Sequence, residues 1–189
     1  MKVQMLQNEN GIVRADRNNN IEYRRILRAT REGRLVRLRN GLYAHPEALT
    51  ENVVDIESIV PDGIVCLYSA WTHYNLTTQI PNAFYVAVER SRKIYLPVFP
   101  DITLVYQRKE LLDIGKTQIV VQGIRLTITD VERSVCDAVK YRHKIGIDVM
   151  VEIIDNYLRL PNRNISKLTE YAKQLRVYNI LYTILQVKL

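Results

Sequence analysis

Arginine is the residue whose number and spacing point most directly to chemistry in this 189-residue chain. Seven arginines fall within sixteen positions near the N-terminus: Arg24, Arg25, Arg28, Arg31, Arg34, Arg37 and Arg39. A guanidinium group pairs bidentately with phosphate and with the acceptor edge of guanine. The first 45 residues hold ten Lys and Arg against four Asp and Glu, which places +6 of the net charge of +7 there. Such a concentration of charge is expected of a segment that faces a polyanion.

The elements that must position these arginines can be read from periodicity and turn residues. Residues 21–32 have a helical pattern, with Asn20 as the N-cap and Gly33 as the stop. The expected inward stripe is formed by Tyr23, Ile26, Leu27 and Thr30. Residues 34–39 and 42–45 flank the dipeptide Asn40-Gly41, and this pattern predicts a β-hairpin. In that hairpin we expect Arg37 and Arg39 to share a face with Leu35.

A helix followed by an arginine-bearing hairpin is the final part of a winged helix-turn-helix. Two shorter helices, at residues 2–8 and 12–18, are expected before it. The helix would present Arg24, Arg25, Arg28 and Arg31 to the major groove of double-stranded DNA. Arg34, Arg37 and Arg39 would contact the phosphate backbone. We therefore predict a DNA-binding domain.

The chain as a whole is predicted to be a mixed α+β protein. Residues 1–48 would form the winged helix-turn-helix, 49–60 a connector, and 61–189 a mixed α/β domain that ends in a helical bundle. In the second domain, strands are expected at 84–88, 102–106, 118–121 and 124–128. Helices are expected at 66–74, 130–143, 147–159, 166–175 and 178–187.

The remaining reactive residue types do not form a recognisable catalytic or metal-binding pattern. His45, His73 and His143 are far apart in sequence, and Cys66 and Cys136 have no cysteine partner nearby. Both cysteines sit among apolar residues, which favours buried free thiols. We therefore expect no enzyme activity, no metal and no cofactor.

One arrangement keeps an enzymatic alternative open. Pro100-Asp101, an apolar run and then Gln107-Arg108-Lys109 are similar in layout to the Pro-Asp…Asp/Glu-x-Lys pattern of metal-dependent nucleases. That chemistry needs a second carboxylate to hold the divalent ion. Gln107 stands where the second carboxylate should be, so a strand leaving a Pro-Asp turn is the simpler interpretation.

A charged run in the second domain is a further candidate site, and its spacing favours a structural role. Glu132 and Arg133 are adjacent, while Arg133 and Asp137 are spaced i, i+4 and can pair on one helix face. The simpler interpretation is a structural ion pair that docks the helix against the sheet.

Several segments resemble the AbiEi family of antitoxins from type IV toxin–antitoxin systems. They are the hairpin string at 33–44, the runs at 66–70 and 76–81, and Asp130–Asp137. The resemblance implies a cytoplasmic regulator of abortive infection, a form of phage defence, that represses its own operon at inverted repeats. It also implies that the second domain counters a nucleotidyltransferase-like toxin, without requiring direct contact. Arg133 and Asp137 would then belong to the antitoxic surface.

The remaining alternatives concern membrane insertion, secretion, dimerisation and ligand binding. No apolar run reaches the length of a membrane helix, and the N-terminal residues lack a signal-peptide pattern. The last helix carries Ile180, Leu181, Ile184 and Leu185, which can pack in the core or form a homodimer interface. A plain regulator whose second domain binds a small ligand remains a further alternative.

Overall fold

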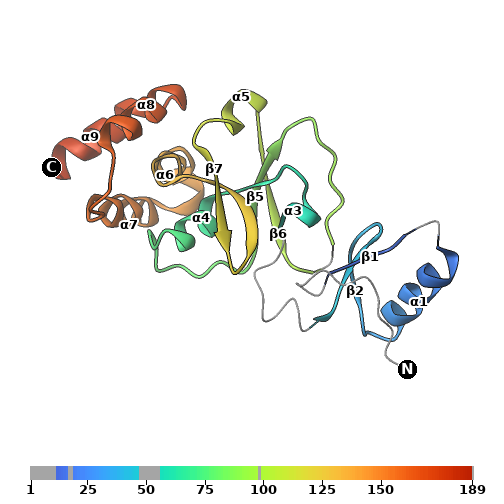
Figure 1. Cartoon of the computed structure of the whole chain (residues 1–189). Helices are drawn as coiled ribbons and strands as arrows, with labels where there is room; N and C mark the ends of the chain where they lie inside the picture. The colour runs from blue at the N-terminus through green and yellow to red at the C-terminus, as the bar shows by residue number, and fades with distance from the viewer. Residues whose placement is uncertain (1–11, 17–18, 47–55, 98, 189) are drawn as a thin grey trace. The chain divides into compact units, whose positions relative to one another are not determined.

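The computed structural model describes residues 12–16, 19–46, 56–97 and 99–188, and these form helices and sheets as the mixed α+β prediction requires (Figure 1). The chain divides into two compact units. One contains residues 1–61, 93–102 and 120–126, and the other contains 62–92, 103–119 and 127–189. No helix in the described ranges is long and apolar enough to cross a membrane.

The N-terminal part of the first unit has the order strand, helix, strand, strand. Strand β1 (Ile12–Arg14), helix α1 (Asn20–Arg31), strand β2 (Val36–Arg39) and strand β3 (Leu42–Ala44) follow one another. The strands form an antiparallel sheet in the order β1-β3-β2. Val13, Ile26, Ala29, Leu35 and Tyr43 form its buried core. Helix α3 (Ile56–Ile59) follows later in this unit.

The expected helix at 12–18 is wrong in its described residues. Residues 12–14 form β1, in which Val13 pairs with Tyr43 and is fully buried. Two consecutive β-branched residues favour a strand, and a three-residue pairing with the hairpin outweighs a weak helical pattern. The helix expected at residues 2–8 lies outside the described residues.

A five-stranded sheet is the central element of the remaining chain. Its strands are β4 (Ile64–Val65), β5 (Phe84–Glu89), β6 (Ile102–Gln107), β7 (Lys116–Val121) and β8 (Ile124–Thr129). They lie in the order β6-β5-β4-β8-β7, with β4 antiparallel to β5 and parallel to β8. The four expected strands are confirmed. The two-residue β4 was not predicted, because two residues show no alternation.

Six helices lie in the second unit. They are α4 (Leu67–His73), α5 (Lys109–Leu112), α6 (Val131–Ile145), α7 (Ile147–Leu158), α8 (Ile165–Gln174) and α9 (Tyr178–Lys188). Helix α6 is the central helix of this unit, because α4, α7, α8 and α9 all contact it (Figure 1). Five of the six helices match expected ones within a residue or two. The four-residue α5 was not expected.

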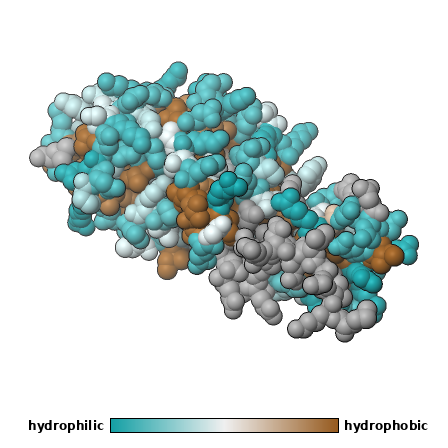
Figure 2. All heavy atoms as spheres, viewed as in Figure 1, coloured by the Kyte–Doolittle hydropathy of each residue, from teal (hydrophilic) through white to brown (hydrophobic). Residues whose placement is uncertain are grey.

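Burial in this unit follows the expected apolar stripes. Trp71 is fully buried and donates from Nε1 to the carbonyl of Ser134 on α6 at 2.9 Å. Leu181 and Leu185 of α9 are buried in the same core, so core packing of the last helix is confirmed. The face shown in Figure 2 is mostly hydrophilic, with small hydrophobic areas between.

The side chain of Glu152 on α7 forms hydrogen bonds with residues 77 and 78, which follow α4. Its carboxylate accepts from the amide and hydroxyl of Thr78 at 2.7 and 2.8 Å and from the hydroxyl of Thr77 at 3.1 Å. Partial burial by itself raises the pKa of Glu152, but these three hydrogen bonds outweigh it and the pKa lies below its usual value. The charged carboxylate is therefore the form that the fold prefers.

We expect Glu152→Ala to lower the free energy of unfolding by about 0.5–1.5 kcal/mol at pH 7, because the exposed donors of Thr78 and the half-buried hydroxyl of Thr77 lose a charged acceptor. A carboxyl whose folded pKa is depressed stabilises the fold above its unfolded pKa, near 4.5, and loses this effect as the pH falls. Urea unfolding at pH 7 and pH 3 should show the difference from wild type shrinking at the lower pH. A difference independent of pH would contradict the role of the charge.

Candidate nucleic-acid interface

Helix α1 begins and ends at residues whose chemistry fixes its length. The side chain of Asn19 accepts from the amide of Glu22 at 3.2 Å and caps the helix, so the N-cap lies one residue before the expected Asn20. At the other end, Gly33 has φ +72° and its amide donates to the carbonyl of Thr30. Gly33 is thus the expected stop, because this conformation suits glycine.

The helix separates an apolar face from an arginine face. Ile26 and Ala29 are buried, and Tyr23, Leu27 and Thr30 are half-buried, so the expected inward stripe holds with Ala29 added. The opposite side carries three exposed arginines, Arg24, Arg28 and Arg31, and Arg25 is exposed on the flank of the helix. With a rise of 1.5 Å per residue, α1 is roughly 18 Å long, enough to lie in a major groove.

The hairpin β2–β3 forms at Asn40-Gly41 as expected, and Gly41 has φ +79°. The pairing shifts between Arg37 and Arg39, which marks a bulge. Arg37 is exposed, whereas Leu35 precedes β2 and is buried in the core of the unit. The expectation that Leu35 shares a face with Arg37 is therefore wrong, because the strand starts one residue later.

Acidic partners neutralise only part of this arginine set. Arg28 Nε lies 2.9 Å from one carboxylate oxygen of Glu32, and Arg34 contacts the other. Hydrogen bonds from Arg34 and then Arg28 hold the pKa of Glu32 below its usual value. Within the described ranges, Arg24, Arg25 and Arg31 form no ion pair. Three guanidinium groups on one helix thus remain available to an external anion.

The second expected pair, Arg133 and Asp137, is also formed, but at a different kind of place. Arg133 Nε donates to Asp137 Oδ1 at 3.0 Å, and the two side chains are 1% and 0% exposed. Neither lies on the surface, contrary to the expectation of an antitoxic surface. A partner cannot touch them while the domain is folded.

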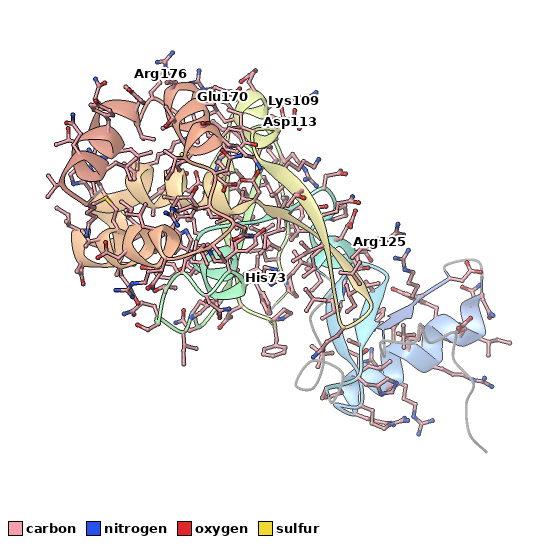
Figure 3. The ribbon with its side chains drawn as sticks, turned by 60° about the vertical axis from the view of Figure 1, so that its left-hand side comes forward. His73, Lys109, Asp113, Arg125, Glu170 and Arg176 are labelled. Carbon is pink, nitrogen blue, oxygen red and sulfur yellow. The ribbon has the colours of Figure 1, made fainter. Side chains whose placement is uncertain are left out.

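Backbone carbonyls and one amide complete the shell around Arg133. Its Nη1 donates to the carbonyls of Leu111 and Ile114 at 2.5 and 2.8 Å, and its Nη2 donates to Gln107 Oε1 at 2.8 Å. The charged side chains of α5, Lys109 and Glu110, are exposed, and so is that of Asp113 at its C-terminal end (Figure 3). Burial raises the pKa of Asp137, and the neighbouring Arg133 guanidinium opposes that rise. The arrangement ties α6 to the end of β6 and to α5.

Gly115 makes this close approach possible. It has φ +66°, and a Cβ at this position would lie 2.4 Å from the Cβ of Arg133. Its carbonyl accepts from the amide of Asp130, the N-cap of α6. A side chain here would separate the loop from α6.

Other charges of the 130–137 run hold neighbouring helices. Lys167 of α8 lies 2.9 Å from Asp130 Oδ2 and 3.5 Å from Glu132 Oε2. Glu132 also accepts from the hydroxyl of Tyr157 on α7 at 3.3 Å. Residues 130–137, one of the segments that resemble the AbiEi family, therefore connect α6 to α7 and α8.

The geometry does not assemble the residues of the nuclease alternative. Gln107 is buried and engaged with Arg133, while Asp101 is exposed. In the described part of the chain, no three His, Cys, Asp or Glu side chains gather as a metal site would require. Cys66 and Cys136 are buried free thiols, as expected, and burial raises the pKa of both.

Sequence reasoning missed two contacts within the N-terminal part of the first unit. The contact of Arg34 with Glu32 depends on the turn at Gly33 and has no periodic signal, although the i, i+4 spacing of Arg28 and Glu32 could have been read. The pairing of β1 with β3 was missed because three residues carry little pattern.

No protein-family model and no curated protein sequence matches this chain.

Proposed function

We propose that this protein is a DNA-binding transcriptional regulator, with α1 in the major groove and the β2–β3 hairpin as a wing along the phosphate backbone. One observation carries the proposal: α1 exposes Arg24, Arg28 and Arg31 on the side opposite its buried residues, with Arg25 exposed beside them. The strand–helix–hairpin order and the exposed Arg34 and Arg37 support a winged-helix arrangement. We assign a further backbone contact to Arg39, whose side chain lies outside the described part of the structure.

The electrostatic part of the proposal has a quantitative test. If about six phosphates are neutralised, the logarithm of the association constant should fall with the logarithm of salt concentration with a slope near −5. Fluorescence anisotropy with a labelled 30-base-pair duplex from upstream of the gene, titrated between about 50 and 300 mM NaCl, measures this slope. A duplex of scrambled sequence separates specific from general binding. A flat line for both duplexes would overturn the proposal.

Glu32 offers a prediction in the opposite direction. We expect Glu32→Gln to raise DNA affinity by about threefold at low salt, because it frees Arg28 and Arg34 from a competing carboxylate. The same duplex titration measures it. Glu170→Gln, an identical charge change on α8 of the second unit, is the matched control and should leave the affinity unchanged (Figure 3). Equal gains from both variants would assign the effect to net charge alone.

For the second unit we propose the antitoxin role that the family resemblance implies. The resemblance rests on residues 33–44, 66–70, 76–81 and 130–137. Since Arg133 and Asp137 are buried, they would act only through the shape that they give to the unit. Co-expression with a nucleotidyltransferase-like protein encoded beside this gene tests the role: growth should be restored by the full chain. Continued growth arrest at equal expression of the chain would argue against it.

A further inference from the structure

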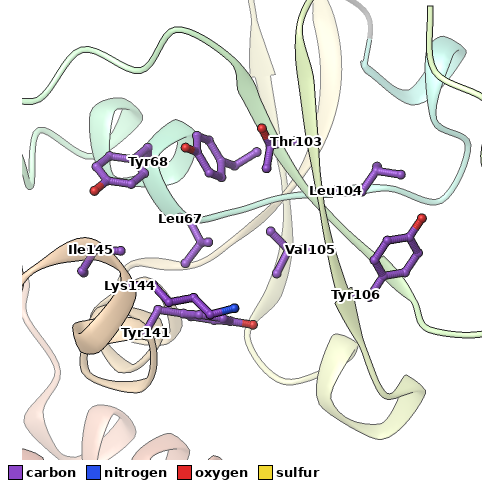
Figure 4. Close-up of a pocket in the computed structure, with 10 residues that line it drawn as sticks. Leu67, Tyr68, Thr103, Leu104, Val105, Tyr106, Tyr141, Lys144 and Ile145 are labelled. Carbon is purple, nitrogen blue, oxygen red and sulfur yellow. The ribbon is translucent and has the colours of Figure 1, made fainter.

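The second unit contains a pocket with a volume of about 420 Å³, within the size range of small-molecule sites. Its lining comes from four elements: Leu67 and Tyr68 of α4, Tyr85 of β5, residues 103–106 of β6, and the end of α6 (Figure 4). Leu67, Val105 and Ile145 give it an apolar body. The DNA-binding proposal uses none of these residues.

The polar groups of the pocket share one property, because all of them can donate a hydrogen bond. They are the ammonium group of Lys144, the hydroxyl of Thr103 and the phenol groups of Tyr68, Tyr85, Tyr106 and Tyr141. No carboxylate side chain lines the pocket. Burial raises the pKa of Tyr141 to about 12, so its phenol keeps its proton at neutral pH.

Positive charge lies on one side of the pocket. It is the ammonium group of Lys144, whose Nζ is 5.9 Å from the centroid of the Tyr141 ring. The opposite side is aromatic, with the ring centroids of Tyr68 and Tyr85 5.2 Å apart. Aromatic walls favour a flat ring in the ligand, and donors with an ammonium group favour an anionic end.

We propose that this pocket binds a small aromatic carboxylate, with the ring between α4 and β6 and the carboxylate at Lys144. The site goes beyond DNA binding and does not depend on it, since the residues of the two sites do not overlap. It would make the chain a ligand-binding regulator.

Isothermal titration calorimetry of the full chain tests the site with 3-phenylpropionate and with its neutral analogue 3-phenylpropanamide. We expect the carboxylate to bind with one site and a dissociation constant below about 1 mM, and the amide to bind about tenfold more weakly. Absence of saturable binding of either compound up to about 10 mM would overturn the proposal. Equal affinities in the wild-type protein would overturn the assignment to carboxylates.

Three variants locate the binding. Lys144→Met should remove the advantage of the carboxylate over the amide. Lys173→Met is the matched control, because Lys173 is exposed and lies 5.3 Å from the ring centroid of Tyr178, away from the pocket lining; it should bind like wild type. Thr103→Trp places a large ring at an exposed lining position and should weaken both compounds at least about tenfold. Wild-type affinities in Lys144→Met and Thr103→Trp would show that the compounds bind elsewhere.

Discussion

Replacing Arg24, Arg28 and Arg31 together by alanine should weaken binding to double-stranded DNA by at least about a hundredfold at 150 mM salt. These three arginines are spaced i, i+4 and i+7 and are exposed on the face of α1 opposite Ile26 and Ala29. Each lost phosphate contact also removes about 0.9 from the salt slope, so the slope should become shallower by nearly 3. Duplex titrations at several salt concentrations measure both quantities, and the exposed positions should leave thermal unfolding almost unchanged.

Two further triple variants decide whether position or net charge matters. Alanine at Arg159, Arg163 and Arg176 removes the same charge from exposed positions of the second unit and should change the affinity only slightly. Lysine at Arg24, Arg28 and Arg31 keeps the charge but loses bidentate hydrogen bonds. It should retain the salt slope and lose discrimination between the upstream and scrambled duplexes. Equal losses from both alanine triples would refute the placement of α1 in the groove.

The parts of the fold that could be predicted are those with local signals. Helix α1 follows from its apolar stripe and Gly33, and the hairpin follows from Asn40-Gly41, because both depend on residues close in sequence. Strand β1 could not be predicted. It forms through pairing with β3, about thirty residues later, and its own three residues have no periodicity to show this.

The same distinction explains what could be foreseen of Arg133. Its pair with Asp137 follows from i, i+4 spacing on one helix. Its burial does not, since the carbonyls that accept from it belong to Leu111 of α5 and to Ile114 in the turn that follows, about twenty residues earlier in the chain. Carbonyl groups are present at every residue, and only the fold decides which ones face a guanidinium group. The structural ion pair expected from the spacing is therefore present, whereas the surface role implied by the family resemblance does not agree with the burial of both side chains.

Substituting Arg133 by methionine should lower the free energy of unfolding of the second unit by about 3–5 kcal/mol at pH 7. Methionine replaces the aliphatic stem of arginine but not its guanidinium group, so it leaves Asp137 buried and unpaired and leaves the carbonyls of Leu111 and Ile114 without this donor. The fluorescence of Trp71, the single tryptophan, reports on this unit because the residue is fully buried there. Urea unfolding followed at this signal measures the change.

The pH dependence and a second substitution separate loss of the ion pair from simple misfit. Burial raises the pKa of Asp137 and the Arg133 guanidinium opposes the rise, so Arg133→Met removes that opposition. A carboxyl whose folded pKa is raised destabilises the fold increasingly as the pH rises above its unfolded value, near 3.8. The deficit in the free energy of unfolding of Arg133→Met should therefore be largest at neutral pH and shrink toward pH 4.

Adding Asp137→Leu should recover part of the lost stability at pH 7, because an apolar pair costs no desolvation of charge. Additive losses in the double variant, equal at both pH values, would show that Arg133 acts through its shape and not through its charge.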